Sequence, residues 1–286
     1  MISSGRSSRF IIQALHSKFL ISHFTLFRRS QKVKDLRSSI LSKRPQLEAL
    51  QISELAPWLL VSSTVTCDVT LEETILDRLS EVPSEIAIEI AHTGLQTWDP
   101  SYVPAGLLRR AANWIDREPS LSAICSQVVE NLHLIRAEAR FDISHSEPRW
   151  RRKIFVSVPE RDDAVGAVRL AESIIHEAMH LHLTDYEEVK PLVSEFAGKM
   201  RSPWKTEHRP YQGVMHGLFV FACLSQYFRN MLRVFEQDEA ARNHCVRRVA
   251  DIAAEIRSIN IDELSIGLTG AGALLAKNWQ RFGRIG

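Results

Sequence analysis

Apolar residues recur at helical spacing along most of the chain and at strand spacing in one short segment. Helices are predicted over about 35–55, 70–82, 106–115, 121–140, 164–183, 211–237 and 239–258, with two short helices after Asn260 and Thr269. The segment 153–158, Lys-Ile-Phe-Val-Ser-Val, is apolar and β-branched and stops at Pro159, so it is predicted to be a strand. The pattern therefore predicts a mainly α protein, a single helical domain with a few short strands.

The predicted helix from about Ala164 to Leu183 is apolar on nearly all sides, which is typical of a helix in a protein core. It nevertheless carries His176, Glu177 and His180. Buried histidine and glutamate side chains lower stability unless they are paired or bound to something. The apolar pattern alone therefore indicates a partner for these three side chains.

These residues form the pattern H-E-x-x-H, in the run His176-Glu-Ala-Met-His180. Residues four apart lie on one face of a helix, so the two imidazoles can grip one metal ion. Glu177 lies about 100° round the helix. It can reach a metal-bound water or brace a ligand. The alternative is a buried helix with two hydrogen-bonded histidines.

A metal site needs at least a third protein ligand and an open position for chemistry. The downstream candidates are Glu187, Glu188, Glu195, His208 and His216. Glu187 and Glu188 lie just past the predicted end of the helix and are expected at the solvated surface. Only His216 lies in a strongly apolar predicted helix, between Gly213 and Gly217, where a ligand or another backbone can come close. His216 is therefore the preferred third ligand, which places the site between two core helices. Glu195 is the alternative, as the carboxylate of a zinc-peptidase arrangement.

Two chemistries suit such a site. A zinc metallopeptidase would use Glu177 as general base, whereas an iron oxygenase would need open positions for a cosubstrate and dioxygen. Arg209 precedes His216 by seven residues and could bind the distal carboxylate of 2-oxoglutarate in a bidentate manner. An ordinary surface arginine explains Arg209 equally well. The residues alone leave zinc and iron open.

Composition narrows the class of protein. The chain has 286 residues, 45% of them hydrophobic and 24% charged, as in ordinary globular proteins. The net charge of +2 gives no reason to expect nucleic acid or an anionic membrane as a partner. Its four cysteines are scattered without a C-x-x-C pair, which favours a reducing, cytoplasmic location. No run of 18 apolar residues predicts a membrane span.

Three regions are predicted. Residues 1–34 hold seven Arg and Lys residues and no acidic one. They are read as a basic N-terminal arm or helix in preference to a transit peptide. Residues 35–145 are a helical part for packing or substrate recognition, and residues 146–286 are the catalytic part with the H-E-x-x-H motif. The last two regions are expected to form one continuous globule. The sequence says nothing of the oligomeric state.

Taken together, the motifs of residues 150–235 resemble those of a known family. They are the run Leu170–His180, then Ser202-Pro-Trp204, Arg209-Pro210 and Gly213-Val-Met-His-Gly217, in that order. The segment is similar to the HExxH motif-containing peptide-modification family, which includes 2-oxoglutarate-dependent peptide β-hydroxylases of ribosomal peptide biosynthesis. This combination is far more specific than the five-residue motif by itself.

The resemblance implies a mononuclear Fe(II) dioxygenase that hydroxylates a side-chain Cβ of a ribosomally synthesised precursor peptide. It implies that His176, His180 and His216 hold the iron. Arg209 would then anchor 2-oxoglutarate and Trp204 would wall the pocket, although packing explains Trp204 equally well. Glu177 would orient a ligand or hold a water rather than drive hydrolysis. A zinc metallopeptidase remains the alternative.

Overall fold

The computed structural model describes residues 56–60, 69–92, 94–98, 102, 105–137, 141–195, 198–235 and 237–284. The basic arm predicted for residues 1–34 and the helix predicted for 35–55 lie outside these residues. Within them the protein is mainly helical with a few short strands, as the sequence predicts. No helix of these segments is both long enough and apolar enough to cross a membrane.

Four helices precede the sheet or pack beside it: α3 (Leu71–Thr74), α4 (Ser84–His92), α5 (Ala105–Asp116) and α6 (Pro119–Val128). A capping box formed by Thr70 and Glu73 opens α3. The predicted helix over 70–82 is too long, however, because α3 ends at Thr74. The residues after α3 lie against the sheet instead: the backbone N–H of Ser80 donates to the carbonyl of Leu132 in β2 (Asn131–Arg136).

The main sheet has the order β1-β2-β4-β3 and contains β1 (Gln96–Thr97), β2 (Asn131–Arg136), β3 (Ser144–His145) and β4 (Lys153–Ser157). Strand β4 confirms the strand predicted from the sequence. The prediction of one helix over 121–140 is wrong in its second half. The helix α6 ends at Val128, and residues 131–136 form β2, which pairs in parallel with β4. Leu132 lies opposite Ile154 in that pairing, and Leu134 lies opposite Val156.

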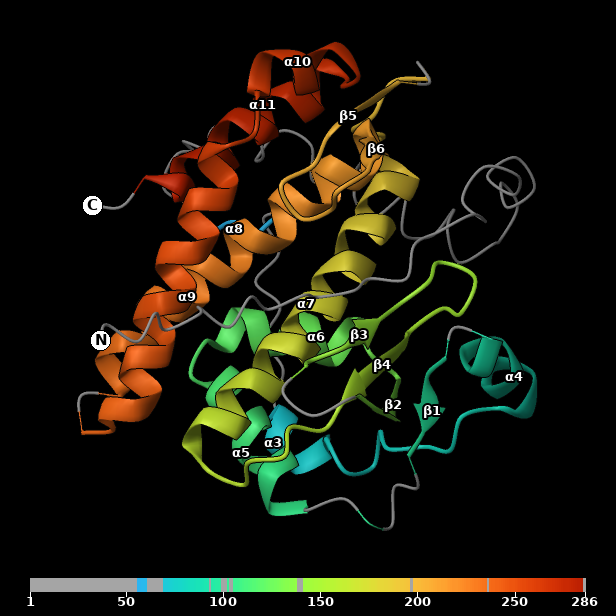
Figure 1. The fold of residues 1–286 in the computed structure, drawn as a ribbon, viewed down its shortest axis with the longest axis vertical. Helices are drawn as coiled ribbons and strands as arrows, with labels where there is room; N and C mark the ends of the chain where they lie inside the picture. Colours follow the sequence, from blue (N-terminus) through green and yellow to red (C-terminus); the bar gives the residue numbers. More distant parts are fainter. Residues whose placement is uncertain are drawn as a thin grey trace, which may run out of the picture.

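Helix α7 (Ala164–Val189) runs through the middle of the molecule (Figure 1). It contacts β3 and β4 of the sheet, α5 and α6 at one end, and the later helices α8 and α9. Asp163 caps its first turn by accepting from the backbone N–H of Gly166 at 2.9 Å. Every side chain from Leu170 to Met179 is buried, as the all-round apolar pattern predicts.

The C-terminal half packs on the opposite side of α7 from the sheet. A two-stranded ribbon of β5 (Lys199–Arg201) and β6 (His208–Pro210) leads directly into α8 (Tyr211–Val234), which is followed by α9 (Glu239–Arg257). The chain ends in α10 (Ile261–Ile266), α11 (Gly270–Gln280) and the 3₁₀ helix η2 (Arg281–Gly283). Asn260 and Thr269 cap α10 and α11 as predicted.

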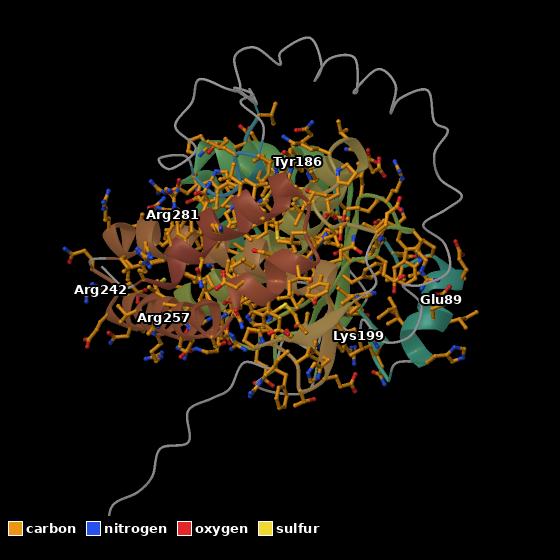
Figure 2. The ribbon with its side chains drawn as sticks, turned by 90° about the horizontal axis from the view of Figure 1, so that it is seen from above. Glu89, Tyr186, Lys199, Arg242, Arg257 and Arg281 are labelled. Atoms are coloured by element: carbon orange, nitrogen blue, oxygen red, sulfur yellow. The ribbon has the colours of Figure 1, made fainter. Side chains whose placement is uncertain are left out.

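Apolar side chains from Trp58 to Phe282 form one continuous buried cluster around α7 and α8. Many charged side chains lie outside it, such as Arg242 and Arg257 of α9 and Lys199 of β5, which are labelled in Figure 2 and are exposed. Because α7 and α8 both lie inside this cluster, the histidines on their facing sides are shielded from most of the solvent.

Candidate metal centre between α7 and α8

The structure brings the three predicted histidines together. The ring centroids of His176 and His180, one turn apart on α7, are 4.9 Å apart. The ring of His216 on α8 stacks on His180 with a centroid distance of 5.6 Å and an angle of 18° between the planes. Their Nδ1 atoms face each other at 3.4 Å. Three imidazoles from two packed helices therefore form one cluster.

The spacing of the facing nitrogens agrees with a shared cation. Two nitrogens bound tetrahedrally at about 2.1 Å from one zinc-like ion lie about 3.4 Å apart, which is the separation of the two Nδ1 atoms. In the described parts of the chain, however, no group of three or more His, Cys, Asp or Glu side chains is already arranged to hold a metal ion. The structure thus gathers the three rings without arranging them as a complete set of metal ligands.

One ring nitrogen of His176 has no hydrogen-bond partner among the described residues. This atom is Nδ1, and it is buried. Burial lowers the pKa of His176 most; Glu177 and Glu172 act in the opposite direction, and the charges of Arg248 and Lys205 lower the pKa further. The ring is therefore held in its neutral form, which is the form that binds metals. An unsatisfied buried nitrogen beside two other imidazoles is free to act as a metal ligand.

Glu177 lies beside His176, and both of its carboxylate oxygens are bound by residues of the sheet region. The hydroxyl of Ser144 donates to its Oε1 at 2.6 Å, and the hydroxyl of Ser146 donates to its Oε2 at 2.5 Å. His176 Nε2 lies 3.9 Å from Oε1. Both carboxylate oxygens are thus held by β3 and the residue after it, an arrangement that suits bracing more than proton transfer. Its catalytic role stays a prediction.

Glu187 lies beside the cluster, in contrast to its predicted place past the helix end at the solvated surface. Helix α7 continues to Val189, so Glu187 falls two turns after His180 on the same face. Its Oε2 is 2.8 Å from Nε2 of His216, and its side chain is only 12% exposed. The absence of Gly or Pro between Leu183 and Pro191 was the signal that the helix continues.

The glycines that flank His216 admit side chains of the preceding segment. A Cβ placed on Gly213 would lie 3.4 Å from Nε of Arg209, and one placed on Gly217 would lie 2.3 Å from Cζ3 of Trp204. Both predicted cosubstrate-binding residues therefore lie against the helix that carries His216. The two glycines thus admit side chains, where the sequence predicted a ligand or another backbone.

Trp204 is fixed on both sides. Its indole stacks on Phe221 of α8 at 4.8 Å and 13°, and its Nε1 donates to Glu255 of α9 at 3.0 Å. Phe221 in turn meets the ring of His176 edge to face at 5.5 Å. Trp204 is thus one aromatic layer away from the histidine cluster, so packing explains it at least as well as contact with a cosubstrate does.

The β5–β6 ribbon brings two cations near the cluster: Lys205 in its connecting loop and Arg209 on β6. Lys205 and Arg209 are both half-buried. Burial lowers the pKa of each, and the charge of Arg209 lowers that of Lys205 further, while Glu207 acts in the opposite sense. A half-buried pair of like charges favours an anion beside it, so this segment could receive a carboxylate.

The other proposed ligands lie elsewhere. Glu188 forms an ion pair with Arg151 at 2.6 Å. Glu195, the predicted alternative carboxylate ligand, and His208 of β6 are exposed. A small cavity of about 50 Å³ lies on a different face of α7, beside Leu181 and Asp185, and none of the three clustered histidines lines it.

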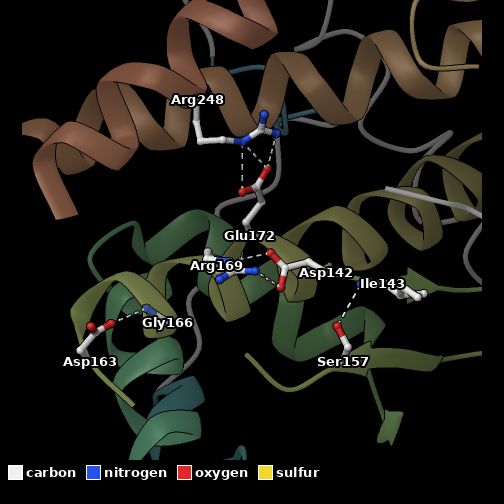
Figure 3. A network of polar contacts seen from close by, with 8 residues as sticks. All are labelled: Asp142, Ile143, Ser157, Asp163, Gly166, Arg169, Glu172 and Arg248. Atoms are coloured by element: carbon white, nitrogen blue, oxygen red, sulfur yellow. Dashed lines mark hydrogen bonds and ion pairs between the residues drawn. The ribbon is translucent and has the colours of Figure 1, made fainter. Parts of the chain in front are cut away.

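Two buried ion pairs support the first half of α7 (Figure 3). Glu172, one turn before His176, accepts from Nε of Arg248 on α9 at 3.0 Å, and both side chains are 4% exposed. Arg169 donates to both oxygens of Asp142, from Nε at 2.8 Å and from Nη2 at 2.9 Å. These pairs tie α7 to α9 and to the segment before β3, and thereby fix the helix that positions His176 and His180.

Comparisons with known proteins add no assignment. A scan of the chain against protein-family models finds no match, and a search of curated proteins finds none. The function must therefore be argued from the site itself and from the motifs of the sequence.

Proposed function

We propose that the protein is an Fe(II)- and 2-oxoglutarate-dependent hydroxylase acting on a side-chain Cβ of a ribosomally synthesised precursor peptide. The observation that carries this proposal is the cluster of His176, His180 and His216 between two core helices, next to the cationic segment of Lys205 and Arg209. The family resemblance of the motifs supplies the substrate class. Buried thiols at Cys125, Cys223 and Cys245 are compatible with a reducing cytoplasm.

The donor set fits iron. His176, His180 and His216 would hold the ion, since imidazole suits iron and the buried Nδ1 of His176 has no other partner. When bound, iron would supply the coupled oxidation in which 2-oxoglutarate and dioxygen give succinate and carbon dioxide and one oxygen atom enters the Cβ–H bond. Three protein ligands would leave positions on the ion open for these reactants.

The remaining residues would bind and orient. Arg209, lying against Gly213 one turn before His216, would pair with the distal carboxylate of 2-oxoglutarate, and Lys205 would add a second positive charge. Phe221 contacts the ring of His176, and Trp204 stacks on Phe221; together they would exclude water from that side of the imidazole. Glu177, held by Ser144 and Ser146, would keep its negative charge near the cluster without reacting.

The test has three steps. Anaerobically purified protein is reconstituted with Fe(II), and its metal content is measured together with the visible charge-transfer absorption that appears on adding 2-oxoglutarate. Oxygen is then admitted with a precursor peptide encoded near the gene, and succinate and a peptide heavier by one oxygen atom are measured. We expect His176→Ala to abolish iron binding and turnover. Stoichiometric zinc with peptide cleavage would refute the proposal.

A zinc metallopeptidase is the second candidate function. It is favoured by the carboxylate of Glu187 beside His216, because two histidines and a glutamate form a common catalytic zinc set. It is disfavoured by the position of Glu177, whose two oxygens both accept hydroxyl hydrogen bonds from the β3 region. Glu177→Gln separates the two: it should abolish a zinc peptidase and leave substantial hydroxylase turnover.

A further inference from the structure

Glu187, His216 and His180 form a short polar chain across the interface of α7 and α8. Oε2 of Glu187 is 2.8 Å from Nε2 of His216, and Nδ1 of His216 is 3.4 Å from Nδ1 of His180. The two ring nitrogens of His216 therefore face different partners, one a carboxylate and the other an imidazole of the proposed metal site. The side chains of Glu187 and His216 are only 12% and 13% exposed.

This arrangement selects one tautomer of the neutral His216 ring. A carboxylate only accepts hydrogen bonds, so the ring proton must reside on Nε2 to satisfy Glu187. Nδ1 is then left with its lone pair, on the side of the ring that faces His180. A metal bound by His216 would accordingly be bound through Nδ1.

Glu187 is itself oriented by α8. The side-chain amide of Gln212, one turn before His216, donates to the same Oε2 at 3.2 Å. Glu187 thus receives two hydrogen bonds from α8 while its backbone belongs to α7, the helix that supplies His180. The carboxylate consequently fixes the His216 ring relative to the helix of the other ligands.

We infer that Glu187 is a positioning residue for the metal site: it holds His216 as the Nε2–H tautomer and directs Nδ1 at the cation shared with His180. This inference deepens the proposed function and rests on its metal site, although it is independent of the hydroxylation chemistry. Glu187 is not assigned as a fourth ligand, because it lies at the opposite ring nitrogen from the one that faces His180. A carboxylate that accepts from a ligating histidine is a common way to tune metal affinity.

The first measurement reads the tautomer directly. Two-dimensional ¹H–¹⁵N spectra of the histidine side chains in the metal-free protein should show a protonated Nε2 and a pyridine-like Nδ1 for His216, assigned with His216→Gln. We expect Glu187→Gln to retain this pattern, since its amide oxygen still accepts, and Glu187→Ala to lose it. The opposite tautomer in the wild-type protein would overturn the inference.

The second measurement is metal affinity, with Co²⁺ as a spectroscopic probe in a competition titration. Glu187→Ala should weaken binding roughly 10–100-fold, the usual effect of removing such a partner, and Glu187→Gln should recover most of that loss. Glu188→Gln is the matched control, because Glu188 is the next residue of α7 and its partner Arg151 lies at the surface. It should leave the affinity unchanged.

Each result has one reading. If Glu187→Gln loses affinity as fully as Glu187→Ala and shifts the visible Co²⁺ bands, Glu187 is a ligand and the positioning role is wrong. If Glu187→Ala binds like the wild type, or if the wild type binds no Co²⁺, the inference also fails. Dependence of Co²⁺ affinity on Glu187 without 2-oxoglutarate turnover would instead support the inference and refute only the hydroxylase.

Discussion

The indole of Trp204 occupies the space that any side chain at Gly217 would need. A Cβ at Gly217 would lie 2.3 Å from Cζ3 and 2.5 Å from Cε3 of the indole, well inside van der Waals contact. Trp204 and Lys205 lie in the loop between β5 and β6, which leads to Arg209, and Gly217 follows His216. This contact therefore joins the cationic segment to the helix that carries His216.

Gly217→Ala should therefore displace the loop. Overpacking of this kind lowers the free energy of unfolding by about 1–3 kcal/mol, measurable by urea denaturation followed through tryptophan fluorescence. The KM for 2-oxoglutarate should rise while Co²⁺ affinity stays close to wild type. Gly106→Ala is the control, since the nearest atom to its added Cβ would be 3.6 Å away. Equal effects of the two substitutions would contradict the role of the Trp204 contact.

Arg209→Met should impair use of the cosubstrate without impairing metal binding. Loss of a charge-assisted pair with a carboxylate costs about 1.5–3 kcal/mol, so the KM for 2-oxoglutarate should rise roughly 10–100-fold. The iron content of the purified protein should not change. Arg201→Met is the matched control, because Arg201 lies on the paired strand β5 and is exposed. An unchanged KM in Arg209→Met would remove Arg209 from the cosubstrate site.

Arg248→Met should destabilise the whole protein. It leaves the carboxylate of Glu172 buried without its partner, and breaking a buried pair in this way costs about 3–5 kcal/mol in the free energy of unfolding. Combining it with Glu172→Leu should recover much of that loss, because no uncompensated charge is then buried. The exposed neighbour Arg247 offers a control, and Arg247→Met should change stability by less than about 0.5 kcal/mol.

His244 makes stability sensitive to acid. Burial lowers its pKa to about 4, although Glu172 acts in the opposite direction. An unfolded chain protonates histidine near pH 6.5, so the stabilising effect of the neutral buried ring is complete above about pH 6.5. It is lost progressively as the pH falls toward 4. His244→Gln should therefore reduce the loss of unfolding free energy over this window by up to about 3 kcal/mol.

Denaturation curves recorded at several pH values between 7 and 4 would measure this effect. His92→Gln, at the exposed end of α4, provides the comparison. If both variants lose stability with the same slope as the wild type, burial of His244 is not a source of the acid sensitivity.

Local patterns predicted the elements whose own spacing favours one secondary structure clearly. Helices α7, α8 and α9 and strand β4 follow from their own apolar spacing and caps. Residues 131–136 could not be predicted, because Leu132 and Ile135 continue the helical spacing of Ile124 and Val128. This segment becomes a strand only because it pairs with β4, which is distant from it in the sequence.

The metal centre shows the same division. His176 and His180 come from one helical motif, and His216 could be chosen by its apolar surroundings and glycine neighbours. Glu187 was placed at the surface because the apolar positions of the helix thin out after Leu183. The hydroxyl partners of Glu177, Ser144 and Ser146, were not predictable, because the fold alone brings them to α7.

The unbroken run of α7 from Ala164 to Val189 has a practical consequence. Its inward face repeats as Glu172, His176, His180 and Glu187, so the five-residue motif is the middle of a longer spacing: Glu-x₃-His-Glu-x₂-His-x₆-Glu. Genomes can be scanned with that longer string. It separates chains able to share this buried architecture from the many in which two histidines fall four apart by chance.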